Sequence, residues 1–584
     1  MGQHDLPASF DAEGTRVDAA ANGGIAHVEA IEHASRFERR LHRVRDGVWC
    51  VVGNGLSNQT FVEGPEGLIA IDTGDSVEEM AWALGRVREH TDAPIASVIY
   101  SHFHYVGGTR ALVDAGAPAD LPIWSHAGVV PNRSRQTGEV GPVARYGLVH
   151  QFGMLLPRDG PDALVGCGLG PAFRLPDHAP YTEGFLPPTD TFDAPVTTTL
   201  AGLRVEMTPA ESDATDSITI WFPELSVCVN NLMWPALFNV FAIRGEEYRD
   251  PRILLAGFDH LIGLDAEHLV GTHGPPIGGA ERIRTELTRS RDAIQFLWDQ
   301  TVRGINLGLT HGELTEFVQL PDAFAESYFQ TQFYGLAEHH VRQIHTGLRG
   351  WFDGDTEQLF PVPPVERAQR LIAGFGGAHE VRRQVDGAIG ADDLRWAVEL
   401  ATWLVRVGPD DADDRRRLAT ALRRIGQRTT AANIRNWCLT RARELDGDLD
   451  TSRFRVHRFG RDQVATADPS ELVHVLRVML DPHRCSGADQ HLRVEFPDGS
   501  AGLHVRNHVA VPTAGDDADL VLTIGRAAWG DALNGGRSIA HVLGDGDATA
   551  SDPAAVVEML SWFEFGDAAI NRSQAHGRRS ESSV

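Results

Sequence analysis

The feature that most constrains the fold is a series of short apolar segments that end in a histidine or an acidic residue. Between residues 48 and 100 these segments are four to eight residues long and are separated by Gly-containing turns, a pattern typical of buried strands. Asp72, His102, Asp213 and His273 each lie at or just beyond the end of such a segment. Layered α/β folds place their functional side chains at the carboxyl ends of strands. The order therefore predicts one site at one edge of a β-rich domain.

The strongest chemical signal within this series is the stretch SHFHYVGG, residues 101–108. His102 and His104, two residues apart after a buried strand, can both turn to one side where the chain bends and offer two imidazoles to a borderline metal such as zinc. Taken alone, the same pattern fits two surface histidines on a loop. Glu211 and Asp213 in TPAESD and His273 in GTHGPP add candidate ligands and favour the metal interpretation.

Length and charge bound the possible architectures and partners. A chain of 584 residues is expected to form three or four domains, because domains usually contain roughly 100–200 residues. The net charge of −27 argues against nucleic acid and anionic membrane surfaces as partners. No apolar run approaches the length of a membrane span, and the N-terminal stretch has no signal-peptide pattern.

Cysteine and lysine usage narrow the chemistry. The five cysteines lie far apart without a C-x-x-C pair, which favours a reducing cytoplasmic location over a disulfide framework. The chain contains no lysine, so all 53 basic residues are arginine. Schiff-base chemistry, pyridoxal-phosphate attachment and a P-loop lysine are therefore excluded.

The remaining pattern predicts a succession of regions. We expect a loosely held arm over 1–40, a β-rich domain over 41–320, a helical region over 321–450, an α+β region over 451–570 and a disordered tail over 571–584. Within the second of these, the Gly- and Pro-rich insertion over 126–190 is expected to form pocket walls or oligomer contacts without regular structure. Residues 281–308 are expected to form one long amphipathic helix.

The motif order IDTG, H-x-H with a following GG, TPxE and GTHGPP resembles the metallo-β-lactamase superfamily. Within that superfamily the chain resembles the alkylsulfatases, through VGNGLSNQTFVEG, FLPPTDTF, AIRGEEYRD and above all FYGLAEHHVRQIHTGLRGWFDG. The resemblance extends over about 45–570. It implies an αββα sandwich, an all-α dimerisation domain that joins a homodimer through 281–450, and an α+β C-terminal domain similar to sterol-carrier proteins.

The chain departs from the family pattern at the metal ligands. The family signature H-x-H-x-D-H-x-G-G becomes HFHYVGG, which lacks the Asp-His pair, and Asn230-Asn231 stands where the family carries a bridging glutamate. In the family's terms, the first metal position keeps His102, His104 and an acid that corresponds to Asp213 or Glu211. Of the family's ligands to the second metal, the chain keeps little beyond His273. Two cations need many ligands to offset their mutual repulsion. We therefore expect one zinc ion rather than two, with iron or manganese as alternatives.

Two further matters stay open at the sequence level. Two histidines of the insertion, His126 and His150, are possible additional ligands, and so is Asn231. The C-terminal region also carries an apolar helix stripe and an aromatic cluster, which indicate either ordinary core packing or a surface that presents an apolar substrate: Leu472, Val475, Leu476, Met479, Trp562, Phe563 and Phe565.

Arg244 in AIRGEEYRD matches the family's sulfate-contacting arginine, and Asn239 matches a nearby position of the same pattern. A guanidinium fork suits a tetrahedral oxyanion because it donates paired hydrogen bonds. The alternative is an ordinary salt bridge from Arg244 to Glu246, Glu247 or Asp250. The resemblance assigns catalytic roles to Arg244, Asn239 and Asp213.

Three functions are compatible with these residues. The first is a metal-dependent hydrolase that acts on a small amphiphilic anionic ester such as an alkyl sulfate. The second is a mononuclear metalloenzyme on the same scaffold with different chemistry, because a His-His-carboxylate set also suits iron with open positions. The third is a non-catalytic dimeric binding protein. Fold alone does not choose among them, so the choice depends on the site.

Overall fold

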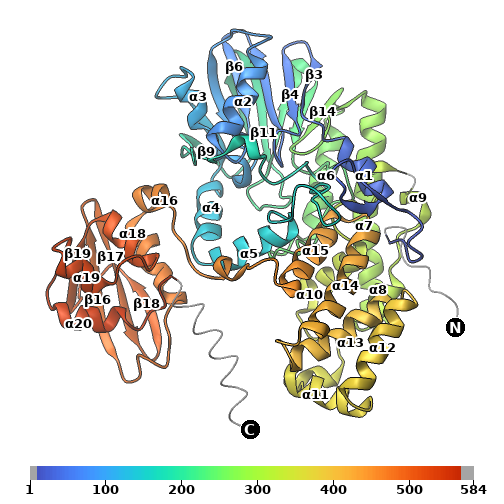
Figure 1. The fold of residues 1–584 in the computed structure, drawn as a ribbon. Coiled ribbons are helices and arrows are strands. Elements are labelled where there is room, and N and C mark those ends of the chain that lie inside the picture. Colours follow the sequence, from blue (N-terminus) through green and yellow to red (C-terminus); the bar gives the residue numbers. More distant parts are fainter. Residues whose placement is uncertain (1–9, 326, 567–584) are drawn as a thin grey trace. The chain divides into compact units, whose positions relative to one another are not determined.

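The computed structural model describes residues 10–566 apart from residue 326 (Figure 1). The chain forms two compact units. The first contains the described residues up to 130 together with 147–449, and the second contains 131–146 together with the described residues from 450 onward. Each unit has its own hydrophobic core, and each is described separately below.

The first unit begins with two β-sheets. Seven strands form one sheet in the order β3-β4-β5-β6-β7-β8-β9, and six form the other in the order β10-β11-β12-β13-β14-β15. The strands of the first sheet are β3 (Arg40–Arg45), β4 (Val48–Val52), β5 (Gln59–Gly64), β6 (Gly67–Ile71), β7 (Ile95–Ile99), β8 (Ile123–His126) and β9 (Asp190–Phe192). Those of the second are β10 (Val196–Leu200), β11 (Leu203–Pro209), β12 (Ile218–Phe222), β13 (Val227–Asn230), β14 (His268–Gly271) and β15 (Ile277–Gly278).

The two sheets pack face to face with helices on both outer faces. Val62 and Ile99 of the first sheet share one buried core with Ile220 and Val229 of the second. Helices α2 (Val77–Val87) and α3 (Arg110–Asp114) cover the outer face of the seven-stranded sheet, and α6 (Pro251–Gly263) and α7 (Ala280–Asn306) cover that of the six-stranded sheet. Figure 1 shows the sheets with α2 and α3 beside them. The expected αββα sandwich is confirmed, as is the single long helix after residue 280.

Residues 10–40, expected to be a loosely held arm, are instead bound to the rest of the unit. They form β1 (Val17–Ala19), β2 (Ile25–His27) and α1 (Val28–Ser35). The amide of Ile25 donates to the carbonyl of Pro161 at 3.0 Å. Buried His33 stacks on Phe333 with ring centroids 4.0 Å apart. The Ala/Gly-rich composition suggested mobility because the partners of this segment lie far along the chain. Residues 1–9 lie outside the described part.

The insertion over 126–190 is more regular than its Gly and Pro content suggested. It contains α4 (Val129–Thr137) and α5 (Gly141–Gln151), followed by an irregular stretch with one short turn of helix at Pro176–His178. Residues 131–146 belong to the second unit. Arg145 donates to the carbonyls of Val456 and Arg458, both at 2.7 Å, and the Arg455 guanidinium lies 3.7 Å from the centre of the Tyr146 ring.

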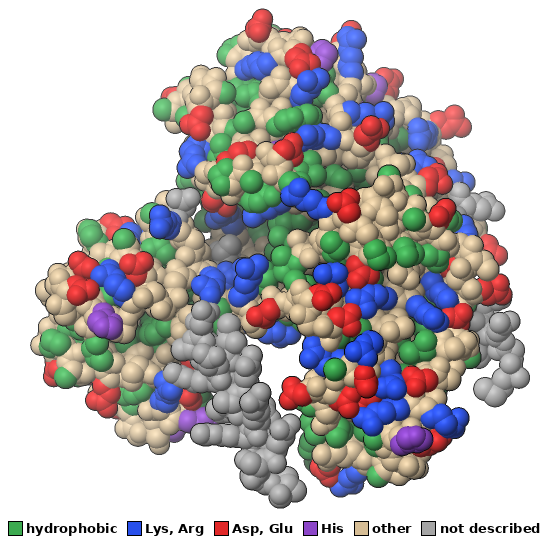
Figure 2. All heavy atoms as spheres, viewed as in Figure 1, with side chains coloured by type: hydrophobic (Ala, Val, Ile, Leu, Met, Phe, Trp, Pro, Cys, Tyr) green, Lys and Arg blue, Asp and Glu red, His purple; other side chains and the backbone are tan. Residues whose placement is uncertain are grey.

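The rest of the first unit is helical, with α8 (His311–Phe317), α9 (Asp322–Ala325), α10 (Ala337–Arg349), α11 (Pro364–Gly374), α12 (Ala378–Gly390), α13 (Leu394–Val407), α14 (Ala412–Arg428) and α15 (Ala432–Asp446). Ion pairs join α12 to α14, for example Arg382 to Asp414 at 2.7 Å. Figure 2 shows acidic and basic side chains close together on the visible face of this region. None of the helices in the described chain combines the length and apolarity needed to span a membrane.

The second unit contains a five-stranded sheet in the order β18-β17-β16-β19-β20. Its strands are β16 (Asp489–Phe496), β17 (Gly499–Arg506), β18 (Val509–Thr513), β19 (Leu520–Ile524) and β20 (Ala548–Ala550). The accompanying helices are α16 (Arg461–Thr466), α17 (Pro469–His474), α18 (Arg526–Leu533), α19 (Ile539–Gly544) and α20 (Pro553–Leu560). The expected α+β organisation is confirmed. The tail expected over 571–584 lies outside the described residues.

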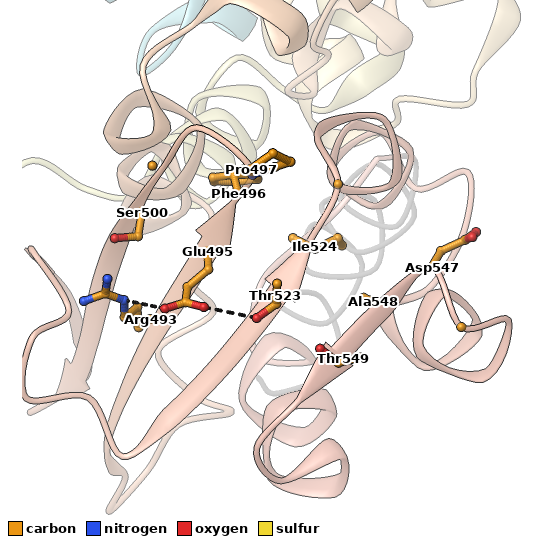
Figure 3. A pocket seen from close by; sticks show the side chains of 13 residues that line it. Arg493, Glu495, Phe496, Pro497, Ser500, Thr523, Ile524, Asp547, Ala548 and Thr549 are labelled. Atoms are coloured by element: carbon orange, nitrogen blue, oxygen red, sulfur yellow. Dashed lines mark hydrogen bonds and ion pairs between the residues drawn. The ribbon is translucent and has the colours of Figure 1, made fainter.

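The apolar stripe of this unit is core and not a surface. Leu472, Val475, Leu476 and Met479 are all buried around Trp529, with Trp562 and Phe563 also buried and Phe565 packed against the same cluster. An open hollow of about 510 Å³ on the sheet is lined by both polar and apolar side chains, and in it Glu495 accepts from Arg493 at 3.1 Å and from Thr523 at 3.2 Å (Figure 3). Because the stripe residues are buried, they do not form an exposed apolar surface.

Candidate metal centre

The candidate site lies where strand ends of the two sheets meet. His102 and His104 follow β7, Asp213 follows β11, Asn231 follows β13 and His273 follows β14. Backbone hydrogen bonds join the sheets at this edge. The amide of Ile218 donates to the carbonyl of Ser101 at 2.9 Å, and the amide of Asn58 donates to the carbonyl of Thr272 at 2.7 Å. Segments remote in the sequence are thus brought to one place by the sandwich.

The two glycines after His104 allow the site loop to pack closely against the loop that follows β6. A Cβ atom on Gly108 would lie 2.1 Å from the carbonyl oxygen of Thr73, and one on Gly107 would lie 2.7 Å from that of Asp75. Neither glycine has a positive φ angle. The close approach of the two loops, rather than a left-handed backbone conformation, is what requires glycine here.

Three side chains form a group with the spacing of metal ligands. In His102, His104 and Asp213, one donor atom of each lies within 4.8 Å of the donors of the other two. His102 Nε2 lies 3.8 Å from Asp213 Oδ1, and His104 Nδ1 lies 3.3 Å from Asp213 Oδ2. All three side chains are at least nine-tenths buried. Glu211, the alternative acid, is not part of this group.

In His102 and His273 the Nδ1 atom carries the ring proton, so the Nε2 atom has a lone pair that is free to bind a metal. His273 Nδ1 lies 2.9 Å from the carbonyl oxygen of Leu56, which can only accept, so Nδ1 carries the proton and Nε2 the lone pair. Ser101 donates to Asp72 at 2.7 Å and lies 2.8 Å from His102 Nδ1, so the serine oxygen accepts from His102. The Nε2 atoms of His102 and His273 are buried without a hydrogen-bond partner in the described chain. Such atoms fit a metal ion.

Burial and neighbouring charges set the protonation states of the group. Burial lowers the pKa of His102 to about 3 and that of His273 to about 4, so both imidazoles are neutral near pH 7. Burial would raise the pKa of Asp213, but His102 and His104 outweigh it and hold the pKa well below its usual range. Burial would lower the pKa of His104, but its contacts with Asp213 and Glu246 outweigh burial and raise the pKa. The neutral imidazoles of His102 and His273 and the Asp213 carboxylate are donors of the kind that bind divalent transition metals.

Asn231 hydrogen-bonds to Asp213, the candidate acidic ligand, and orients it. Its amide nitrogen donates to Asp213 Oδ1 at 2.6 Å and to Ser212 at 2.9 Å. Trp234 donates in turn to the carbonyl oxygen of Asn231 at 3.0 Å. An amide at this position therefore fixes Asp213 toward the histidines without adding a negative charge.

Arg244 lies beside this group in a buried charge cluster. It forms an ion pair with Glu246, whose other oxygen pairs with Arg249. Glu246 Oε1 lies 3.5 Å from His104 Nε2. Burial would raise the pKa of Glu246, but the two arginines outweigh it and lower the pKa to about 2. Arg244 thus has one of the salt-bridge partners that the sequence left open, and its Nε atom is buried without a hydrogen-bond partner in the described chain.

The other candidate residues lie outside the three-ligand group. Asn239 is buried against Gly335, where a Cβ would lie 2.2 Å from its Oδ1, and neither side-chain atom of Asn239 has a hydrogen-bond partner in the described chain. His126 Nδ1 accepts from the amide of Gly128 at 3.0 Å. His150 Nε2 faces Glu444 at 3.2 Å. The structure brings neither histidine to His102.

Sequence reasoning missed several residues that shape this site. Arg249 and Trp234 were not singled out, and Glu246 entered only as a possible salt-bridge partner. Tyr105 was also missed, although its ring lies 5.5 Å from that of His273 and 5.1 Å from that of His102. The alternating charges of RGEEYRD were the one available signal, but a surface loop has the same appearance.

Comparisons with known proteins agree with this architecture. Residues 310–448 match the family model described as alkyl sulfatase dimerisation. A linear primary-alkylsulfatase of Pseudomonas sp. (strain ATCC 19151) is 34% identical over 532 residues, which cover 87% of this chain and 99% of that protein. The alkyl/aryl-sulfatase BDS1 of Saccharomyces cerevisiae is 28% identical, over 76% of this chain and 70% of that protein.

A solved structure extends the likeness to three dimensions. A double mutant of the sec-alkyl sulfatase PisA1 superposes with a TM-score of 0.81 at 25% identity, over 96% of this chain and 92% of that one. The identity and coverage shared with the primary alkylsulfatase decide the family. The chain belongs to the alkylsulfatases.

Proposed function

We propose that the protein is a metal-dependent hydrolase that cleaves anionic alkyl esters, with alkyl sulfates as the first substrate class. The observation that carries the proposal is the buried His102, His104 and Asp213 group beside the buried Arg244 cluster. The relatives named above are sulfatases for primary alkyl and for alkyl or aryl substrates. The reaction would convert the ester and water into an alcohol and sulfate.

The donor set fits one divalent ion, and zinc is the proposed metal because imidazole and carboxylate donors in a compact group suit it. His102 through Nε2, His104 through Nδ1 and Asp213 would hold the ion, with His273 as a fourth donor. The chemistry that a divalent ion supplies in such a site is Lewis acidity, which makes water an effective nucleophile near neutral pH.

The protein's own residues have separate tasks in this proposal. Arg244 would hold the sulfate group through Nε and its guanidinium plane, because an arginine fork matches a tetrahedral oxyanion. Asn231 would keep Asp213 directed at the histidines through the 2.6 Å hydrogen bond. The buried walls around the group would exclude bulk water, which strengthens each electrostatic contact.

Metal content tests the ligand count. We expect about one zinc ion per chain after purification without chelators, because the family's Asp-His pair is missing and Asn231 replaces an acid. Plasma emission spectroscopy against protein concentration measures the ratio. Two tightly bound ions per chain would contradict the mononuclear site, since other residues would then complete the second position.

Sulfate release tests the reaction. With zinc added back, the protein should release inorganic sulfate from medium-chain alkyl sulfates, and chelation should stop the release reversibly. Ion chromatography of the sulfate and gas chromatography of the alcohol check both products. A confirmed bound metal without sulfate release, also with manganese or iron, would favour the second candidate, a mononuclear enzyme with different chemistry. The three-donor group favours that candidate because it also suits iron.

Assembly is a further part of the proposal. We propose a homodimer joined through the helical region, because residues 310–448 match the dimerisation family and carry unusually exposed apolar side chains: Trp351 at 60%, Leu359 at 47% and Phe360 at 92% exposure. Exposed apolar patches of this kind mark interfaces.

Light scattering tests the dimer. We expect a mass near twice the chain's 63.7 kDa at micromolar concentration. Phe360→Asp should shift the equilibrium toward monomer by at least tenfold, because a charge would have to be buried at the interface. The control is Val509→Asp, which alters an exposed residue outside the helical region. A monomeric wild-type protein would contradict the proposal.

A further inference from the structure

Glu246 contacts more than the two arginines whose charge it neutralises. Its carboxylate pairs with Arg244 through Oε1 and with Arg249 through Oε2, and its side chain is only 10% exposed. Oε1 also lies 3.5 Å from His104 Nε2. The carboxylate is therefore placed at the junction between the candidate anion site and the candidate metal site.

The two nitrogens of His104 face two different carboxylates. Nδ1 lies 3.3 Å from Asp213, within the three-ligand group, whereas Nε2 faces Glu246. No hydrogen bond fixes Nε2 within the described chain. If Nδ1 binds a metal, its lone pair is used there, so Nε2 must carry the proton. A protonated, buried Nε2 requires an acceptor, and Glu246 is the carboxylate that faces it.

We propose that Glu246 is a positioning residue, which accepts the Nε2 proton of His104 and thereby holds Nδ1 toward the ion that His102 and Asp213 also bind. This inference rests on the proposed function, because it assigns Glu246 a role at the same site. Metal-binding histidines almost always donate their second N–H to a carboxylate, carbonyl or water, which fixes the tautomer and the ring orientation. The Glu246 carboxylate already accepts from Arg244 and Arg249 in the two ion pairs.

The same carboxylate couples the two halves of the site. Arg244 is held by the atom of Glu246 that also faces His104, so the orientation of the guanidinium and that of the imidazole depend on one side chain. If Glu246 served only as counter-ion to the arginines, a substitution that keeps its charge would leave metal affinity unchanged. The two roles can therefore be separated by measuring metal binding.

Two substitutions test the length and the charge of the Glu246 side chain separately. Glu246→Asp keeps the negative charge for the arginines but withdraws the carboxylate by about 1.5 Å, one carbon–carbon bond. Glu246→Gln keeps the reach and one acceptor oxygen but removes the charge. The matched control is Glu247→Gln, which alters the exposed neighbouring glutamate. Zinc affinity is measured by competition with a chromophoric chelator, and thermal melting of the metal-free protein checks the fold.

We expect Glu246→Asp to weaken zinc binding by about 10- to 100-fold, the usual effect of losing an outer-sphere partner of a metal ligand. Glu246→Gln should weaken it less, and Glu247→Gln should leave it unchanged. A folded Glu246→Asp protein that binds zinc as tightly as the wild type would overturn the inference. A wild-type protein that binds no zinc would overturn both the proposed function and this inference, so the two failures are distinguishable.

Cobalt substitution provides a readout that does not depend on the stability of the Asp variant. In the cobalt(II) protein, the Nε2 proton of a bound His104 should give a shifted, slowly exchanging proton resonance. Glu246→Gln should move this resonance and leave those of His102 and His273 in place. Identical spectra for the wild type and Glu246→Gln would show that Glu246 does not contact His104.

Discussion

Replacement of His102 by alanine is expected to remove the bound metal and sulfate release while the fold persists. His102 lies on the loop after β7, and its Nε2 atom has no hydrogen-bond partner in the described chain. Loss of a direct ligand should weaken metal binding by more than about 100-fold, the upper range for an outer-sphere partner. The lost hydrogen bond to Ser101 should cost only about 1–2 kcal/mol of folding free energy.

Plasma emission spectroscopy measures the metal content. Calorimetry in the presence of EDTA measures the folding stability of the metal-free protein. His126→Ala is the matched control, because this histidine accepts from Gly128 and does not belong to the ligand group. The control should retain full metal content. Full metal content in His102→Ala would show that the H-x-H pair is not the ligand pair.

Replacement of Arg244 by alanine is expected to lower kcat/KM for alkyl sulfates by roughly 10²–10³-fold, in the range observed when one donor to a developing anion is removed. The Michaelis constant should rise and turnover should fall, because the guanidinium would bind both the bound ester and its transition state. Arg244→Lys should recover only part of the loss, since an ammonium cannot supply paired donors. Metal content should stay close to that of the wild type.

Steady-state kinetics with sulfate detection checks this prediction. The matched control is Arg252→Ala, because the Arg252 side chain is 62% exposed and pairs with Asp250. An unchanged kcat/KM in Arg244→Ala would mean that this arginine serves only to neutralise Glu246. That outcome would separate the salt-bridge interpretation from the anion-binding one.

The sequence predicted those parts of the fold that follow from local periodicity. Met80, Ala83, Leu84 and Val87 have the spacing of one helix face, and all four are buried in α2. The helix over 281–308 was predicted nearly to its ends. Helices α4 and α5 were not predicted, because Gly and Pro mask helical periodicity and because tertiary contacts override weak propensity.

The candidate acidic ligand could not be chosen from the sequence for a geometric reason. Glu211 and Asp213 follow the same strand and are two residues apart, so an extended chain would point both to the same side. A tight turn decides between them. The amide of Ser212 donates to the carbonyl of Ala214 at 3.2 Å, and that of Ala210 donates to Ser217 at 2.8 Å. These contacts bring Asp213 to the histidines.

The role of Glu246 was beyond sequence reasoning because its partners come from distant segments. His104 lies on the loop after β7, whereas Glu246 lies on the loop between β13 and α6. Their proximity depends on the packing of one sheet on the other. A charged stretch such as RGEEYRD is polar enough for the surface, and only tertiary structure shows that the side chain of Glu246, the first of its two glutamates, is 10% exposed.

The membership of residues 131–146 in the second unit means that this unit is not a detachable tail. Its chain enters at 131, leaves at 146 and returns at 450. A single cut after Leu449 would leave Arg145 donating to the carbonyls of Val456 and Arg458, so these hydrogen bonds would hold the two fragments together without a covalent link. A protein shortened at the same point would instead leave these donors and Tyr146 without their partners. Fragment complementation, rather than deletion, is therefore the way to add or withdraw this unit without altering the remainder of the chain.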